Sequence, residues 1–184
     1  MNVYDFDGTI YSKDSSIEFY LFVLRKNFKL IQCLPKQLFG ILLYKIGRIN
    51  KTEMKEYYFS FLKKIDAERE VEQFWAIHEK YICEWYREQR TESDIVISAS
   101  PEFLLKPICD ALNVKYLIGS NVDQYTGKFT GSNCKGEEKV RRLREYIDLS
   151  SIDNFYSDSI SDQPLANYAK NAYRIKNGNI YNWI

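Results

Sequence analysis

The sequence of 184 residues predicts an α/β protein with an inserted all-helical subdomain. Short apolar segments alternate with helical segments from residue 94 onward, and such alternation implies a parallel sheet with helices on both faces. Another apolar segment, at residues 2–4, can join the same sheet, whereas residues 14–90 show helical periodicity and no convincing strand. We therefore expect a Rossmann-like doubly wound core formed by residues 1–13 and 91–184, with residues 14–90 inserted after the first strand as a helical cap.

The first expected strand, at residues 2–4, ends at the segment DFDGT. Because side chains alternate along a strand, Asp5 and Asp7 lie on the same side. Gly8 permits a sharp turn, and Thr9 supplies a hydroxyl group. Two carboxylates at a strand end can hold a hard cation, or act as a nucleophile and a general acid/base.

The insert is predicted to contain three or four helices, separated near residues 27, 35, 50 and 66. Asp14-Ser15-Ser16 offers N-caps for the first of these helices. Apolar side chains keep three- and four-residue spacing in two sets: Leu38, Leu42, Ile46 and Ile49, then Val71, Phe74, His78, Tyr81 and Trp85.

The second half of the chain reads as the remainder of the sheet and its helices. Strands are expected at 95–97, 115–118 and 154–156, helices at 102–112, 136–147 and 165–169, and a β-hairpin at 122–129. The segment 172–175 and a turn at 177–179 finish the chain. Polar side chains follow three of the strands: Asp5 and Asp7, Ser98 and Ser100, and Asp158 and Asp162. If the first strand is flanked by the other two, these side chains converge in one crevice, where ligands of such sheets bind.

Composition narrows the classes of function. A net charge of +1 gives no reason to expect nucleic acid as a partner. Four scattered cysteines and one histidine disfavour a zinc site or a disulfide framework, so reduced thiols in a cytoplasmic protein are the simplest interpretation. We expect no signal peptide, because the first strand starts at the initial methionine, and no transmembrane helix, because polar residues interrupt the most apolar stretch.

Four motifs in order resemble those of the haloacid dehalogenase-like hydrolases, and the helical insert resembles the cap of the phosphoserine phosphatase-like subgroup. DFDGT is similar to the first motif, and the segment 95–98 to the second, an apolar strand that ends in Ser or Thr. The third is a lysine near a helix start, for which Lys139 is favoured and Lys135 stays open. DSISD at 158–162 is similar to the fourth. Singly, the serines could cap a helix and the lysines could belong to a solvated face, but the four motifs together favour the resemblance.

The resemblance implies a Mg²⁺-dependent phosphatase that acts on a small-molecule phosphate monoester. Asp5 would be the nucleophile that forms an aspartyl-phosphate, and Asp7 the general acid and base. The implied metal ligands are the Asp5 carboxylate, the main-chain carbonyl of Asp7 and the Asp158 carboxylate. Asp162 would hold one of these ligands in place or contact the metal through a water. The implied phosphate-binding residues are Ser98, Ala99, Lys139 or Lys135, Gly8 and Thr9.

The charge of the insert is uneven, with ten basic and two acidic residues between Leu21 and Lys64. Packing beside the acidic 66–94 segment is one explanation. The other is peripheral contact of the basic, apolar segment 28–48 with an anionic membrane or a lipid-like substrate.

A phosphotransferase with the same chemistry is the main alternative function, and a non-catalytic binding module or a receiver domain fits the motifs less well. We expect a monomer or a weak dimer.

Overall fold

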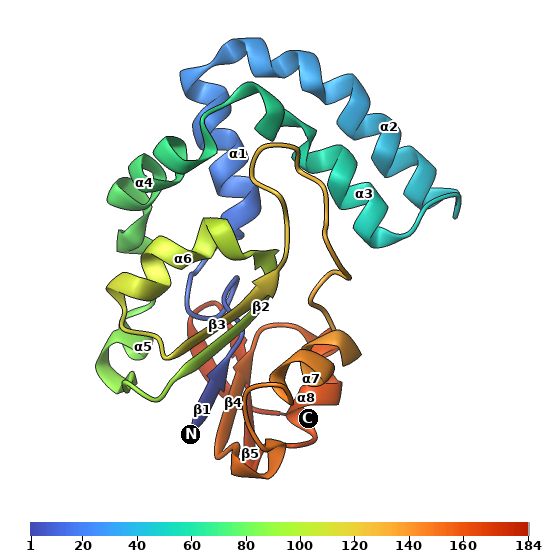
Figure 1. Ribbon diagram of the computed structural model, residues 1–184. Helices are drawn as coiled ribbons and strands as arrows, with labels where there is room; N and C mark the ends of the chain where they lie inside the picture. The colour runs from blue at the N-terminus through green and yellow to red at the C-terminus, as the bar shows by residue number, and fades with distance from the viewer. Residues whose placement is uncertain (184) are drawn as a thin grey trace.

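The computed structural model describes residues 1–183, within which six strands form a single sheet of order β3-β2-β1-β4-β5-β6 (Figure 1). The strands are β1 (Asn2–Tyr4), β2 (Ile95–Pro101), β3 (Tyr116–Ser120), β4 (Asn154–Ser157), β5 (Asn171–Lys176) and β6 (Asn179–Asn182). β1 pairs in parallel with β2 on one side and β4 on the other. The doubly wound sheet is therefore confirmed, with β1 between the two strands that carry the other predicted site residues. The sequence did not predict the edge strand β6, which runs antiparallel to β5.

Helices surround the sheet and extend beyond one of its ends. They are α1 (Ser15–Lys26), α2 (Leu34–Lys45), α3 (Lys51–Tyr58), α4 (Ala67–His78), α5 (Glu84–Gln89), α6 (Glu102–Ala111), α7 (Glu137–Leu143) and α8 (Gln163–Ala166). Short 3-10 helices lie at η1 (Phe28–Cys33), η2 (Phe59–Lys64), η3 (Glu79–Tyr81), η4 (Leu149–Ser151) and η5 (Ile160–Asp162). Within residues 1–183, none of the helices combines the length and the apolar character that a bilayer crossing requires.

The alternation of side chains along β1 divides the core into two clusters. Tyr4 packs against Tyr86 of α5, and the same cluster contains Trp75 of α4 and Leu104 of α6, so α4, α5 and α6 cover one face. The opposite face buries a second set of apolar side chains against α7 and α8: Val3, Ile95, Ile97, Phe155, Val140, Leu143 and Leu165. Both faces of the parallel strands are thus covered, as their continuous apolar character predicts.

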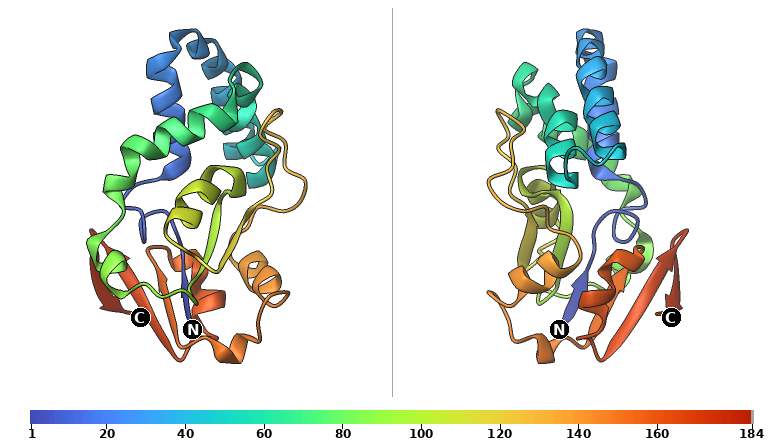
Figure 2. Two further views of the ribbon diagram at one scale, coloured as in Figure 1. Left: turned by 60° about the vertical axis from the view of Figure 1, so that its left-hand side comes forward. Right: turned by 90° about the vertical axis from the view of Figure 1, so that its right-hand side faces the viewer.

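The helices α1 to α3 lie on the side of the molecule away from the N-terminus (Figures 1 and 2). Their starts follow local capping: the Asp14 carboxylate accepts from the amide of Ile17 at 2.9 Å, and Asn50 forms a capping box with Glu53. The later part of the insert, α4, packs on α6 as well as on α1. The division into a core and a 14–90 cap stays a prediction.

Three expected elements differ from the structure. The helix expected over 66–90 ends after α4, because the chain is extended at residues 82 and 83. There Ile82 forms an isolated β-bridge with Tyr11, and the amide of Cys83 donates to the Ile10 carbonyl. The 136–147 helix ends already at residue 143. The 122–129 hairpin reduces to a single bridge, since Asp123 accepts from the amide of Thr126 and closes a turn around its own side chain.

Candidate active site

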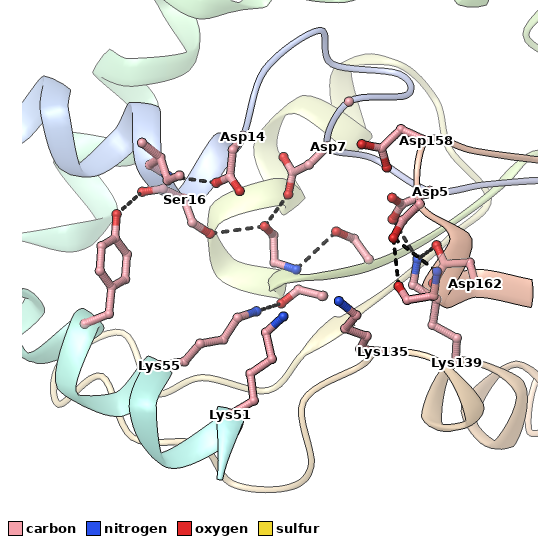
Figure 3. A pocket seen from close by; sticks show the side chains of 18 of the residues that line it. Asp5, Asp7, Asp14, Ser16, Lys51, Lys55, Lys135, Lys139, Asp158 and Asp162 are labelled. Atoms are coloured by element: carbon pink, nitrogen blue, oxygen red, sulfur yellow. Dashed lines mark hydrogen bonds and ion pairs between the residues drawn. The ribbon is translucent and has the colours of Figure 1, made fainter. Parts of the chain in front are cut away.

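A cavity of about 480 Å³ opens beyond the carboxyl ends of β1, β2 and β4 (Figure 3). One side is formed by residues that follow these strands, and the other by side chains of α1 and α3. Its volume lies within the range of small-molecule sites.

All but one of the residues predicted for the site line this cavity. They are Asp5, Asp7, Gly8, Ser98, Ala99, Lys135, Lys139, Asp158 and Asp162. The structure does not bring Thr9 to the cavity: Thr9 is fully buried, and its Oγ1 accepts from the amide of Asp158 at 3.0 Å. Thr9 therefore fixes the backbone that carries Asp158 rather than facing a ligand.

Lys139 lies between two carboxylates at one end of the cavity. Its Nζ donates to Asp5 Oδ1 and to Asp162 Oδ2, each at 2.7 Å, and its side chain is only 2% exposed. Ser157 Oγ donates to the same oxygen of Asp162 at 2.8 Å. Because both lysine contacts are charge-assisted and buried, the three side chains form a rigid unit that fixes the Asp5 carboxylate.

The surroundings of Lys139 and Asp5 keep the lysine charged and raise the pKa of the aspartate toward neutral pH. Burial raises the pKa of Asp5 to about 7, with the charge of Lys139 opposing the rise and that of Asp162 adding to it. Burial disfavours the charged form of Lys139, but Asp5 and Asp162 outweigh this effect and hold its pKa above the ordinary value. Lys139 thus remains a cation and keeps much of Asp5 ionised near neutral pH.

Asp7 is held by two donors from different elements. Its Oδ1 accepts from the amide of Ser15 at 2.7 Å, at the start of α1, and its Oδ2 accepts from Ser100 Oγ at 2.5 Å, at the end of β2. Burial and the nearby charge of Asp14 raise the pKa of Asp7 to about 6, against the lowering effect of these hydrogen bonds. Two hydrogen bonds therefore fix the orientation of the Asp7 carboxylate, and its pKa lies closer to neutral pH than that of an ordinary aspartate.

Gly8 allows Asp158 to approach the first loop. Gly8 has a φ of +70°, and a Cβ built on it would lie 2.3 Å from Asp158 Oδ2. No other residue type fits without displacing this carboxylate. Figure 3 shows Asp158 and Asp5 next to each other at the same end of the cavity.

The end of β2 supplies the neutral part of the lining. Ser98 Oγ accepts from the amide of Ser100 at 3.1 Å, which leaves the hydroxyl proton of the buried Ser98 free to donate into the cavity. The carbonyl of Ala99 accepts from Lys55 and from Ser120, so the turn is held from both sides.

The acidic residues offer an incomplete shell for a cation. Among residues 1–183, no three histidine, cysteine, aspartate or glutamate side chains are grouped so as to hold a metal ion by themselves. Asp162 is engaged by Lys139 and Ser157, and Asp7 by Ser15 and Ser100. Asp5 is held by Lys139 through Oδ1 alone, and Asp158 lies next to it at the same end of the cavity (Figure 3). Such a pair of carboxylates suits Mg²⁺, which usually takes one or two from a protein and completes its shell with waters and phosphate oxygens.

Several cavity residues were not predicted from the sequence. Lys51, Lys55 and Tyr58 come from α3, and Asp14 and Ser16 come from the start of α1. The spacing of Lys51 and Lys55 places both on one helix face. Nothing in the sequence shows that this face turns toward the strand ends.

Comparisons with known proteins agree with this arrangement. The family model described as haloacid dehalogenase-like hydrolase matches residues 3–167. A histidinol-phosphatase from Neisseria meningitidis serogroup C (strain 8013) is 31% identical over 86 residues, which are 40% of this chain and 39% of that protein. The matched segment thus spans well under two thirds of that relative.

Two solved structures show the same fold. A protein of unknown function from Bordetella pertussis Tohama I has a TM-score of 0.78 at 19% identity, over 94% of this chain and 87% of that chain. A phosphoserine phosphohydrolase-like protein from Francisella tularensis subsp. tularensis SCHU S4 has a TM-score of 0.58 at 16% identity, over 93% and 84% of the two chains.

Proposed function

Because the chain belongs to the haloacid dehalogenase-like hydrolase family, whose model spans residues 3–167, we propose that it is a Mg²⁺-dependent phosphatase for a small-molecule phosphate monoester. The observation that carries the proposal is the buried Asp5, which Lys139 contacts at 2.7 Å in the wall of the cavity that Asp7 also lines. The 14–90 segment would act as the cap that limits access to this cavity.

In this proposal Asp5 is the nucleophile. Its carboxylate oxygen bonds to phosphorus, the bond from phosphorus to the ester oxygen breaks, and Asp7 gives its proton to the leaving alkoxide. Asp7 then takes a proton from water, whose oxygen attacks phosphorus and releases phosphate and the free Asp5 carboxylate. The raised pKa of Asp7, about 6, increases the fraction that carries the needed proton.

The residues around Asp5 would bind the phosphoryl group and the metal. Lys139, Ser98 and the amide of Ala99 would bind phosphoryl oxygens at the ends of β1 and β2. Asp5, Asp158 and the main-chain carbonyl of Asp7 would hold Mg²⁺, and Asp162 would support the site through Lys139. A bound Mg²⁺ would supply positive charge that offsets the repulsion between Asp5 and the phosphate. The free thiols of the four cysteines suit a cytoplasmic location.

Release of phosphate from p-nitrophenyl phosphate tests this proposal. We expect turnover with Mg²⁺, loss of turnover in EDTA that added Mg²⁺ reverses, and no turnover by an Asp5→Asn protein whose circular dichroism shows that it remains folded. An Asp5→Asn protein as active as the wild type would refute the mechanism. Transfer of the phosphoryl group to an added alcohol in place of water would identify a phosphotransferase with the same chemistry.

A second proposal concerns an apolar face on α2. Large apolar side chains are exposed there and on the preceding η1: Phe28, Ile31, Leu38, Phe39, Ile41, Leu42, Tyr44 and Ile46. Gly40 lets the other face of α2 approach Tyr57 of α3, since a Cβ at Gly40 would lie 2.3 Å from the Tyr57 side chain. The 28–48 segment also contains four exposed basic residues and no acidic one: Lys29, Lys36, Lys45 and Arg48.

An exposed apolar helix face with only basic charges suits the surface of an anionic bilayer. Co-sedimentation with vesicles of phosphatidylcholine, with and without phosphatidylglycerol, tests this contact. We expect salt-sensitive binding to the anionic vesicles that a Leu38→Gln, Leu42→Gln protein loses. Ile77→Gln is the matched control, because Ile77 is 52% exposed on α4, outside this face. Equal binding by the double variant would refute the contact.

A further inference from the structure

We propose that Lys51, Lys55 and Lys135 form a second anion site in the cavity, so that the preferred substrate carries another anionic oxygen group besides the phosphate that is cleaved. The group would be a carboxylate or a second phosphate on the leaving-group side. This inference rests on the proposed phosphatase function, because both sites share one cavity.

The three lysines come from two elements that meet at the cavity. Lys51 begins α3, Lys55 follows one turn later, and Lys135 precedes α7. In Figure 3 their amino groups point into the same part of the cavity, across from Asp7 and Asp14. Lys55 Nζ is fixed by the carbonyl of Ala99 and by Asn133 Oδ1, each at 2.8 Å.

These three positive charges have no carboxylate partner in the part of the chain that the structure describes. The ion pairs of residues 1–183 engage other lysines, such as Lys13 with Glu18 and Lys139 with Asp5. The charge of Lys139 is thereby compensated within the catalytic unit. The three lysines make no such direct ion pair, and the carboxylates of Asp7 and Asp14 act on Lys55 only from a longer distance. A half-buried cluster of like charges is costly unless an anion joins it.

The energetics of the cluster agree with an anion site. Burial lowers the pKa of Lys55 to about 8, and the neighbouring charge of Lys51 adds to this. Burial and the proximity of Lys135 likewise lower the pKa of Lys51. A bound anion would reverse these effects and favour all three charges. Asp14 lies in the same cavity, but one of its oxygens already caps α1 at Ile17.

The other residues on this side limit the shape of the substrate. Ile17 of α1 and Met54 and Tyr58 of α3 add apolar surface to the cavity. A short carbon skeleton could therefore span from the catalytic unit to the lysines, with its ester phosphate at Asp5 and its second anion at Lys51, Lys55 and Lys135.

The test compares substrates that differ only in the second anion. The pairs are 3-phosphoglycerate against glycerol 3-phosphate, which exchange a carboxylate for a hydroxymethyl group, and fructose 1,6-bisphosphate against fructose 1-phosphate. We expect kcat/KM to favour the more anionic member of at least one pair by about tenfold or more, as a charge-assisted contact provides. The pair that shows the preference distinguishes a carboxylate from a phosphate as the second group.

Lys51→Gln should remove most of this preference while keeping kcat/KM for the less anionic member. Lys64→Gln is the matched control, because Lys64 is exposed on η2 and does not line the cavity. Equal losses for both members of a pair would mean that the lysines bind the transferred phosphate itself, which overturns the inference. The absence of any preference in the wild type would also overturn it.

Binding to an Asp5→Asn protein separates this inference from the proposed function. Calorimetric titration of that protein with the same four compounds, in the presence of Mg²⁺, reads the second anion site without turnover. Tighter binding of the more anionic member, lost on Lys51→Gln, supports the site even if no phosphatase activity is found. Equal affinities within both pairs would refute the site even if the protein is a phosphatase.

Discussion

The ion pairs of Lys139 predict a large and pH-dependent loss of stability on Lys139→Met. The substitution keeps an unbranched side chain in the buried position but leaves Asp5 and Asp162 without the cation that contacts each at 2.7 Å. Removal of one partner from a buried ion pair costs about 3–5 kcal/mol. With a urea m-value of about 2 kcal/mol/M, the midpoint of unfolding should fall by about 2 M.

The loss should be smaller in acid. Without Lys139, nothing opposes the effect of burial, so the pKa of Asp5 in the folded protein rises further above its value in the unfolded chain. A folded carboxyl with a raised pKa is stable while protonated, and the folded state loses stability as the pH rises through that pKa. The variant should therefore recover part of its stability at pH 5 relative to pH 8.

Urea unfolding followed by tryptophan fluorescence at both pH values measures these effects. EDTA is included so that no bound cation replaces the charge of the lysine. Lys106→Met is the matched control, because the side chain of Lys106 is 70% exposed and its pair with Asp110 lies on the surface of α6. It should cost less than about 1 kcal/mol. A cost for Lys139→Met as small as that of the control at pH 8, or one independent of pH, would refute the reasoning.

Two further predictions concern the groups that hold the carboxylates. Gly8→Ala should raise the Mg²⁺ concentration for half-maximal activity about tenfold or more, because the new Cβ displaces Asp158. Gly178→Ala is the control and should leave this concentration unchanged, because Gly178 has a similar φ of +77° but open space around it. Equal effects of the two substitutions would mean that backbone strain alone is responsible. Ser100→Ala should move the alkaline limb of the pH profile of kcat/KM upward by about one unit, because the Asp7 carboxylate loses a donor that lowers its pKa. An unshifted limb would contradict the proposed role of Asp7 as the acid.

Much of the fold and of the site could be predicted because the signals are local. The apolar runs that became β1, β2 and β4 each end in polar side chains, and parallel strands bring such ends together whatever the loops between them do. The positions of Asp5, Ser98 and Asp158 around one cavity follow from this rule. The N-cap at Asp14 and the breaks near Asn50 and Asp66, which the structure shows to be N-caps as well, were also local signals.

The remainder depends on contacts distant in sequence. The break after α4 arises because Ile82 pairs with Tyr11, and periodicity alone continues the helix through it. The contact of Lys139 rather than Lys135 with Asp5 depends on where α7 begins, and a shift of that start would alter which lysine faces inward. The placement of Lys51 and Lys55 over the strand ends depends on how α3 packs, which no local pattern encodes.

The most direct test of the central claim is the detection of the phosphorylated Asp5. The protein is mixed with Mg²⁺ and a turned-over phosphate ester, quenched during the steady state and reduced with borohydride, which converts an acyl phosphate on aspartate to homoserine. Peptide mass spectrometry should find homoserine at position 5 and unmodified aspartate at position 7. Phosphate release from the ester without homoserine at position 5, or with homoserine at another aspartate, would contradict the account.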